Sequence, residues 1–327
     1  MPRKVEISPR TIILIAIFVV SFWILFQIRQ IILGLFIAII LMSALNPSVK
    51  KLERLKLPRW LAILIIYLVV LLVLGVGLAG VVPPLIDQTS TLISKIPEFF
   101  RQFKVWGVDE KVISAQLSQL SALPVNLVKF IISVFSNIVE ILALMVMTFY
   151  LLLERKNLDR YLTVLVGEDK EKQVEEVINK IERRLGGWVR GELLLMLIVG
   201  VFNYVGFRII GLEFALPLAI LAFLLEIIPN IGPTLAAFPA IVIALTVSPL
   251  HALAIAGWCF LVQQLENSIF VPRVMKKIVG INPLVSILSL AVGFKLAGIG
   301  GALLAIPAFI AIQVIVGEVF PSKKFSG

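Results

Sequence analysis

Two oppositely charged residues lie inside strongly apolar stretches in the C-terminal third of the sequence. Glu226 comes shortly before a proline-rich turn at 229–233, and Lys295 comes shortly before a glycine-rich turn at 298–301. An ionisable side chain within an apolar membrane segment costs free energy, which indicates contact with an ion, a proton or a polar solute. A structural ion pair is the alternative for Glu226. For Lys295 the alternative is that its ammonium group snorkels to the membrane surface.

Both turns are rich in residues that interrupt a helix. Proline removes a backbone donor, and glycine permits conformations that other residues avoid. Irregular backbone at membrane depth is tolerated only where it is buried in protein or lines a wet cavity. We therefore predict that the turns act as gates beside a binding site. The predicted gate residues are Pro229, Gly232, Pro233, Gly298, Gly300 and Gly301.

A polar cluster lies near the end of the apolar stretch 252–271. Gln263 and Asn267 are four residues apart and would share one face of a helix, as would Gln264 and Ser268. Amide side chains within a membrane span either hydrogen-bond to another helix or bind a polar solute, and the sequence leaves both roles open. The candidate substrate- or ion-binding residues are Glu226, Asn230, Gln263, Gln264, Asn267 and Lys295.

The composition places these residues in a membrane protein. Of 327 residues, 60% are hydrophobic and only 15% are charged, against about 25% in a typical soluble domain. The mean hydropathy is +1.05. The net charge of +10 comes from bases in short loops beside apolar stretches, so it indicates orientation in a bilayer rather than binding to nucleic acid. The apolar stretches long enough to span are 11–28, 61–82, 130–153, 193–207 with its flanks and 252–271, and 33–45 is shorter.

The distribution of lysine and arginine predicts the orientation. Arg3, Lys4 and Arg10 precede the first stretch, and a second basic group follows the second stretch at 50–59. Because cytoplasmic loops carry the excess of basic residues, both groups are expected in the cytoplasm. Continuing this alternation along the chain places both termini in the cytoplasm.

Residue types argue against several other classes. Cys259 is the only cysteine and His251 the only histidine, which excludes an intrachain disulfide and a Cys/His metal cluster. We find no phosphate-binding loop, no nucleophile beside a base and no paired carboxylates. We therefore predict no enzyme activity, no metal and no cofactor.

The chain divides into three regions. Residues 1–153 are expected to form a transmembrane scaffold with an external amphipathic segment at 83–129. Residues 154–192 predict a cytoplasmic amphipathic helix, with an apolar stripe that would lie along the membrane or on another subunit, so a homo-oligomer is expected. Residues 193–320 hold an internal duplication, because 231–240 and 299–308 have nearly the same sequence.

Each copy of the duplication begins with one long span and continues with an apolar hairpin. The hairpin arms have about 15 residues and reach about 22 Å, against a hydrocarbon core of about 30 Å. One hairpin would enter from each side of the membrane, which makes an inverted repeat typical of alternating-access transporters. We therefore predict an all-α polytopic membrane protein with about eight membrane segments, including two hairpins in a C-terminal inverted repeat.

Three motifs resemble those of the autoinducer-2 exporter family of bacterial permeases. They are Glu226-Ile-Ile-Pro-Asn-Ile-Gly-Pro233, Gln264-Leu-Glu-Asn267 with the later Pro272, and Asn282-Pro283 followed by Gly298 to Pro307. The resemblance covers nearly the whole chain. It implies a bacterial inner-membrane location and a role in exporting the signal autoinducer-2, while other members of the family resemble sodium(lithium)/proton antiporters.

The sequence thus predicts a secondary transporter that exports a small polar solute, with autoinducer-2 as the named candidate. A sodium(lithium)/proton antiporter is the alternative within transport, and a non-transporting membrane scaffold is the alternative outside it. The expected partners are the lipid bilayer and either a polar solute or a monovalent cation or proton.

Overall fold

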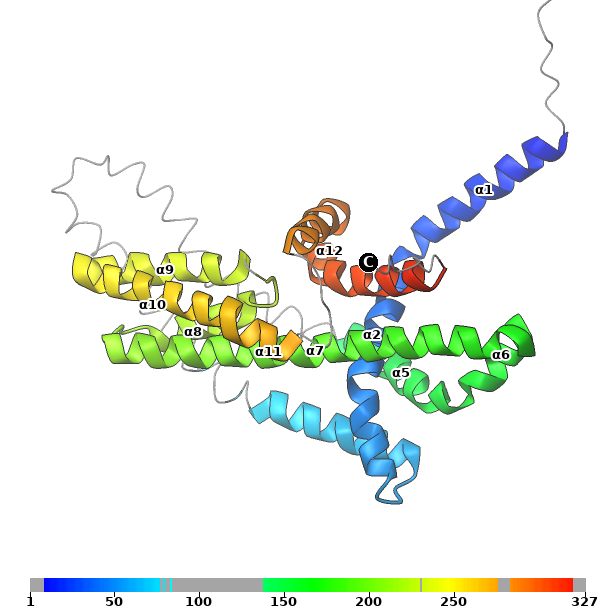
Figure 1. Ribbon diagram of the computed structural model, residues 1–327, viewed down its shortest axis with the longest axis horizontal. Helices are drawn as coiled ribbons and strands as arrows, with labels where there is room; N and C mark the ends of the chain where they lie inside the picture. Colours follow the sequence, from blue (N-terminus) through cyan, green and yellow to red (C-terminus); the bar gives the residue numbers. More distant parts are fainter. Residues whose placement is uncertain are drawn as a thin grey trace, which may run out of the picture.

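The computed structural model describes residues 9–76, 79, 83, 138–229, 231–275 and 283–319, and every regular element in these ranges is a helix. The all-α prediction is therefore confirmed for this part of the chain (Figure 1). The external segment predicted at 83–129 lies outside the described residues, apart from its first residue. The elements are α1 (Pro9–Gln27), α2 (Arg29–Glu53), a helix at Arg59–Val76, α5 (Ile138–Glu154), the 3-10 helix η2 (Arg155–Asn157), α6 (Leu158–Val166), α7 (Glu168–Ile210), α8 (Ala215–Leu225), α9 (Ile231–Val247), α10 (Pro249–Leu265), the π-helix η3 (Glu266–Phe270), α11 (Val271–Met275) and α12 (Pro283–Val319).

Within the described ranges, four helices are long and apolar enough to cross a membrane. Several shorter apolar helices accompany them, including 215–225 and 231–245. This pattern makes the chain a multi-pass membrane protein, while the number of eight segments and the inverted orientation of the repeat stay predictions. The four candidate spans are Arg29–Glu53, Arg59–Val76, Glu168–Ile210 and Leu284–Glu318.

Helix α7 is the central element of the structure. It has 43 residues and packs against α2, α6, α8, α10, α11 and α12 (Figure 1). Its first turn carries Glu168, Asp169 and Glu171, which complement the helix dipole, and it ends at Gly211 in the left-handed conformation (φ +86°). The amphipathic stretch before 192 and the apolar stretch after 193 are one unbroken helix.

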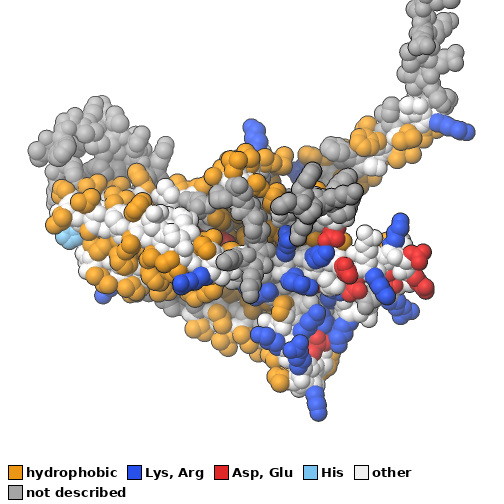
Figure 2. Space-filling model, viewed as in Figure 1, with side chains coloured by type: hydrophobic (Ala, Val, Ile, Leu, Met, Phe, Trp, Pro, Cys, Tyr) orange, Lys and Arg blue, Asp and Glu red, His pale blue; other side chains and the backbone are white. Residues whose placement is uncertain are grey.

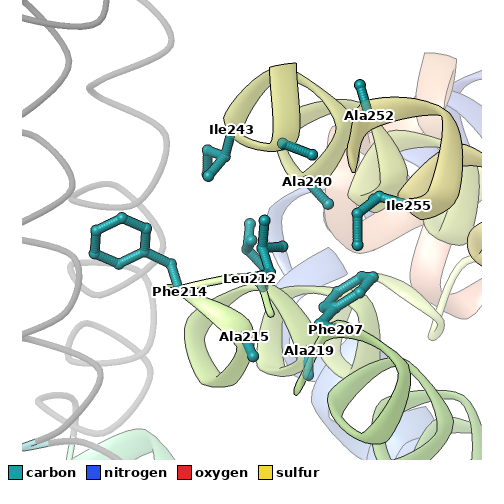
Figure 3. Packing of buried hydrophobic residues seen from close by; sticks show 11 residues of the cluster. Phe207, Leu212, Phe214, Ala215, Ala219, Ala240, Ile243, Ala252 and Ile255 are labelled. Atoms are coloured by element: carbon teal, nitrogen blue, oxygen red, sulfur yellow. The ribbon is translucent and has the colours of Figure 1, made fainter. Parts of the chain in front are cut away.

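The C-terminal part of α7 packs with α8, α9 and α10 around a common apolar core. The side chains of Phe207, Phe214 and Ile255 are almost completely buried in it. Small residues such as Ala219 and Ala240 separate the large ones, which lets the helices approach closely (Figure 3). Helices in a bilayer associate through such close contacts because lipid is as apolar as the side chains themselves.

One glycine marks the closest approach in this core. A Cβ atom at Gly206 of α7 would lie 1.9 Å from Nε1 of Trp258 on α10. The indole N–H of Trp258 donates to the carbonyl oxygen of Phe202 at 3.2 Å, so the ring lies directly on the backbone of α7. Glycine at 206 is therefore required by this packing.

A second bundle joins α2, the helix Arg59–Val76 and α5. Val49, Ile63 and Leu152 form its buried centre. Arg59 is buried and connects the three helices, because its guanidinium donates to the carbonyl oxygen of Leu152 at 2.6 Å, to Glu53 at 2.8 Å and to Asn46 at 3.1 Å. This bundle corresponds to the helical part of the scaffold expected at 1–153.

Both hairpins expected in the duplicated region reverse direction through tight backbone contacts. In α12 the helical conformation breaks at Ala297 and Gly298 (φ +61°), and a Cβ atom at Gly293 would lie 2.3 Å from the carbonyl oxygen of Gly301. In the first hairpin a Cβ atom at Gly232 would lie 1.8 Å from the carbonyl oxygen of Leu225. With the copies aligned by 231–240 and 299–308, Gly232 corresponds to Gly300 and Leu225 to Gly293. The arms therefore approach at nearly equivalent points of the two hairpins, but the glycines that permit the contact are not equivalent.

The packing at Gly206 gives a direct test of the fold. Gly206→Ala is expected to destabilise the purified protein by about 1–3 kcal/mol, because the added methyl group overlaps the Trp258 ring. Thermal unfolding in detergent, followed by fluorescence, measures the change. Gly257→Ala on α10 is the matched control, since a Cβ atom there meets nothing within 4 Å. An unchanged melting temperature for Gly206→Ala would contradict this packing.

Candidate functional site

Three glutamates from distant parts of the chain come together inside the helical bundle. Glu192 on α7, Glu226 at the end of α8 and Glu266 in η3 are 4%, 1% and 2% exposed. Glu226 and Glu266 share a side-chain hydrogen bond, and Glu192 interacts electrostatically with both. We call these three residues the carboxyl cluster.

The local structure explains how each glutamate reaches this position. Glu192 continues the buried face of α7 that includes Leu185, Trp188 and Val199. Glu226 caps the C-terminal end of α8, where the chain leaves the helix for the turn. Glu266 is the first residue of η3, and the wider π-helical turn changes the direction of the side chains that follow α10. Such π-helical turns occur frequently at functional sites.

The carboxyl cluster has unused hydrogen-bonding capacity. Oε2 of Glu226 and Oε1 of Glu192 are buried and have no hydrogen-bond partner among the described residues. Leaving a buried polar atom unpaired costs about 1–3 kcal/mol, so such atoms in a native structure call for a ligand or a proton. The hydrogen bond between Glu226 and Glu266 itself requires a proton on one carboxyl group, because an ionised carboxylate can only accept.

One of the predicted amides contacts the carboxyl cluster. Gln263 is half-buried, and its Nε2 donates to Oε2 of Glu266 at 3.2 Å. Gln264 and Asn267 are exposed on the other side of the same segment. The structure therefore places Gln263 on Glu266 of the carboxyl cluster, whereas Gln264 and Asn267 are exposed.

Lys295 lies apart from Glu226. It is exposed on α12, and the described residues contain no ion pair between the two. The described residues thus show no ion pair at equivalent points of the repeat, and the snorkelling of Lys295 stays a prediction. Asn230 lies outside the described residues.

The turns predicted as gates meet the rest of the molecule in different ways. Ile228, in the turn that follows Glu226, packs against Leu290, Ala302 and Ala305 of α12, so the first turn contacts the second hairpin. Pro229 and Pro233 are half-buried and Gly232 is buried, whereas Gly300 is exposed with open space around its Cβ position. The first turn thus packs against the two arms of the second hairpin.

Sequence reasoning missed two members of the carboxyl cluster and the pairing itself. No paired carboxylates were expected, yet Glu226 and Glu266 are paired. Glu192 lies four residues after Trp188, so it continues the apolar stripe, and this spacing was the signal that could have identified it. For Glu266, the neighbouring amides drew attention to the segment but not to the acid.

Asn203 and Cys259 are held by local contacts, and the described residues contain no metal-binding group. The buried amide of Asn203 donates to the carbonyl oxygen of Val199 at 2.9 Å, and the Sγ atom of Cys259 lies 4.0 Å from its Oδ1 atom. In the described part of the chain, no group of three or more His, Cys, Asp or Glu residues is arranged to hold a metal ion.

Comparisons with known proteins agree with this architecture. The sequence model of the protein family described as "AI-2E family transporter" matches residues 12–320. A Bacillus subtilis (strain 168) protein named "Putative transport protein YrrI" is 28% identical over 311 residues, which cover 90% of this chain and 87% of that protein. The Escherichia coli (strain K12) protein YhhT, named in the same way, is 29% identical over 296 residues, which cover 86% and 81% of the two chains. With a family match over nearly its whole length and a multi-pass helical structure, this chain belongs to the AI-2E family of membrane transporters.

Proposed function

We propose that the chain is a secondary transporter of the bacterial inner membrane that moves a small polar solute outward, with both termini in the cytoplasm. Autoinducer-2 is the candidate solute. The observation that carries the proposal is the buried Glu226, hydrogen-bonded to Glu266 and with one carboxyl oxygen unpaired. A carboxyl group in this setting can exchange a proton or accept a hydrogen bond from a solute.

The position of Glu226 supports a mechanism in which loss of the proton shared with Glu266 changes the contact between the two hairpins. When the pair loses its shared proton, two ionised carboxylates face each other in an apolar interior and repel. Glu226 begins the turn that contains Ile228, and Ile228 packs on the second hairpin. Separation of Glu226 from Glu266 would therefore move the contact between the two hairpins, which is the motion that alternating access needs.

Removing the titratable group at position 226 tests the proton step. Glu226→Gln keeps the side-chain size and a hydrogen bond to Glu266, but it cannot exchange a proton, so proton-coupled flux is expected to fall to the level of protein-free vesicles. Flux is measured in proteoliposomes with an internal pH-sensitive dye and with autoinducer-2 efflux. Glu176→Gln, at an exposed position of α7, is the matched control and is expected to transport normally. Wild-type flux in Glu226→Gln would contradict the assignment.

A sodium(lithium)/proton antiporter is the second candidate function. It is favoured by the two buried, unpaired carboxyl oxygens of Glu192 and Glu226, because an ionisable group inside a membrane bundle can take up and release the proton that such exchange requires. Sodium-driven proton movement in the same vesicles, lost in both Glu192→Gln and Glu226→Gln and without autoinducer-2 efflux, would favour the antiporter. Autoinducer-2 efflux above protein-free vesicles would favour the exporter.

If the protein is a non-transporting membrane scaffold, the hairpins only pack against other helices, and water-soluble reagents are expected not to reach their tips. We expect Gly300→Cys, placed in a Cys259→Ser background, to react with a membrane-impermeant maleimide, because exposed Lys295 indicates that this tip reaches the aqueous or headgroup layer. Gly257→Cys on α10 is the control and is expected to stay unlabelled, since α10, unlike the segment around Gly300, contains no charged residue and Leu253 and Phe260 are exposed beside Gly257. Labelling of neither cysteine from either side would support the scaffold.

A further inference from the structure

A large basic cavity lies beside the charged half of α7. Its volume is about 970 Å³, and it opens between α7, α11 and the C-terminal arm of α12. Glu192, Glu226 and Glu266 are not among its lining residues. Figure 2 shows that lysine and arginine side chains gather on this half of the molecule, whereas the other half is mainly hydrophobic. The charged side chains that line the cavity are Lys180, Arg183, Arg184, Arg190, Arg273 and Glu318.

The cavity has five cationic side chains against one carboxylate, and several of them are held in place. Lys180 pairs with Glu318 at 2.5 Å, and Arg184 donates to Gln313 at 3.2 Å. Arg190 donates to the carbonyl oxygen of Ala44 at 2.9 Å. A guanidinium has five N–H donors, so one such bond positions the group and leaves other donors for a ligand.

Arg183 and Arg273 have the most free donors in the cavity. Four of the five cations make no ion pair among the described residues, and of these four Arg183 and Arg273 also make no side-chain hydrogen bond there. Both are exposed and line the cavity from two different elements, α7 and α11. The two elements meet closely at Gly191, where a Cβ atom would lie 2.9 Å from Sδ of Met275. The same cavity therefore receives one unpaired guanidinium group from each element.

The remaining lining is apolar. Leu194, Val274 and Val314 line the cavity where α7 enters its apolar half. A cavity lined by both cationic and apolar side chains complements a molecule that carries a phosphate at one end and hydrocarbon next to it. Arginine is well suited to this anion, since its planar guanidinium can donate two parallel hydrogen bonds to phosphate oxygens.

We propose that this cavity is a binding site for an organic phosphate, with Arg183 and Arg273 on the phosphate and Leu194, Val274 and Val314 on the apolar part. The ligand's phosphate belongs either to an anionic phospholipid of the surrounding membrane or to a soluble phosphate ester. None of its lining residues belongs to the carboxyl cluster, so its variants leave the groups of the proposed transport step in place.

Binding to the full-length protein tests the proposal. Wild type, Arg183→Gln/Arg273→Gln and the control Lys50→Gln/Lys51→Gln, whose two lysines are exposed at the end of α2, are titrated in zwitterionic nanodiscs. One arm adds phosphatidylglycerol and the other adds soluble glycerol phosphate, and native mass spectrometry counts the bound molecules. We expect saturable binding that is about 30-fold weaker in the arginine variant, since each basic residue contributes about 1 kcal/mol and about 1.4 kcal/mol is tenfold.

The two arms identify the source of the phosphate. Saturable, arginine-dependent binding of phosphatidylglycerol alone supports a lipid site, and the same result with glycerol phosphate supports a soluble ligand. Arg183→Lys/Arg273→Lys keeps the charge and is expected to bind more tightly than the glutamine variant, which separates loss of charge from loss of folding. Binding of neither probe, or equal binding by wild type and the glutamine variant, would overturn the proposal.

Discussion

The burial of three carboxyl groups in an apolar helical bundle constrains the whole C-terminal half of this protein. An isolated ionised carboxylate in such an interior costs far more free energy than any single packing contact returns, so these groups must share protons or bind partners. Glu226 and Glu266 meet this requirement through their common hydrogen bond. Because the two residues belong to the end of α8 and to η3, the bond fixes the first turn against the π-helical segment. The packing of α7 must then accommodate Glu192 beside them.

Close backbone contacts supply the stability that hydrophobic burial cannot supply in a bilayer. Lipid chains solvate apolar side chains as well as protein does, so helices gain from contact only where they fit tightly. Gly206 against Trp258, Gly232 against Leu225 and Gly293 against Gly301 are such points. The last two lie at nearly equivalent points of the duplicated hairpins, although Gly232 corresponds to Gly300 and not to Gly293 or Gly301. In each hairpin a glycine lets the two arms approach closely.

Sequence patterns predicted helices and turns better than they predicted which side chains of different helices come into contact. Apolar length located the helix at 59–76 and the second half of α7, but it missed the full length of α2 and α7, and turn residues located the break at Gly298. Glu226 could be predicted because an acid in an otherwise apolar stretch is conspicuous. Its pairing with Glu266 could not, since it depends on how α7, α8, α9 and α10 pack around a common core and on a local π-helical turn. Glu192 was assigned to the end of a cytoplasmic segment because charged residues precede it, yet the helix continues without a break and turns this side chain inward.

Helix α7 links the carboxyl cluster to the basic cavity within a single turn. Arg190 and Gly191 line the cavity, and the next residue, Glu192, faces the cluster. Successive residues of an α-helix point about 100° apart, so one turn can present a cation to one space and an acid to another. Arg190 and Glu192 belong to the same turn of one unbroken helix of 43 residues. A displacement of this turn that relieves repulsion among the carboxylates therefore also shifts Arg190 and the wall of the cavity, and the two sites share one mechanical element.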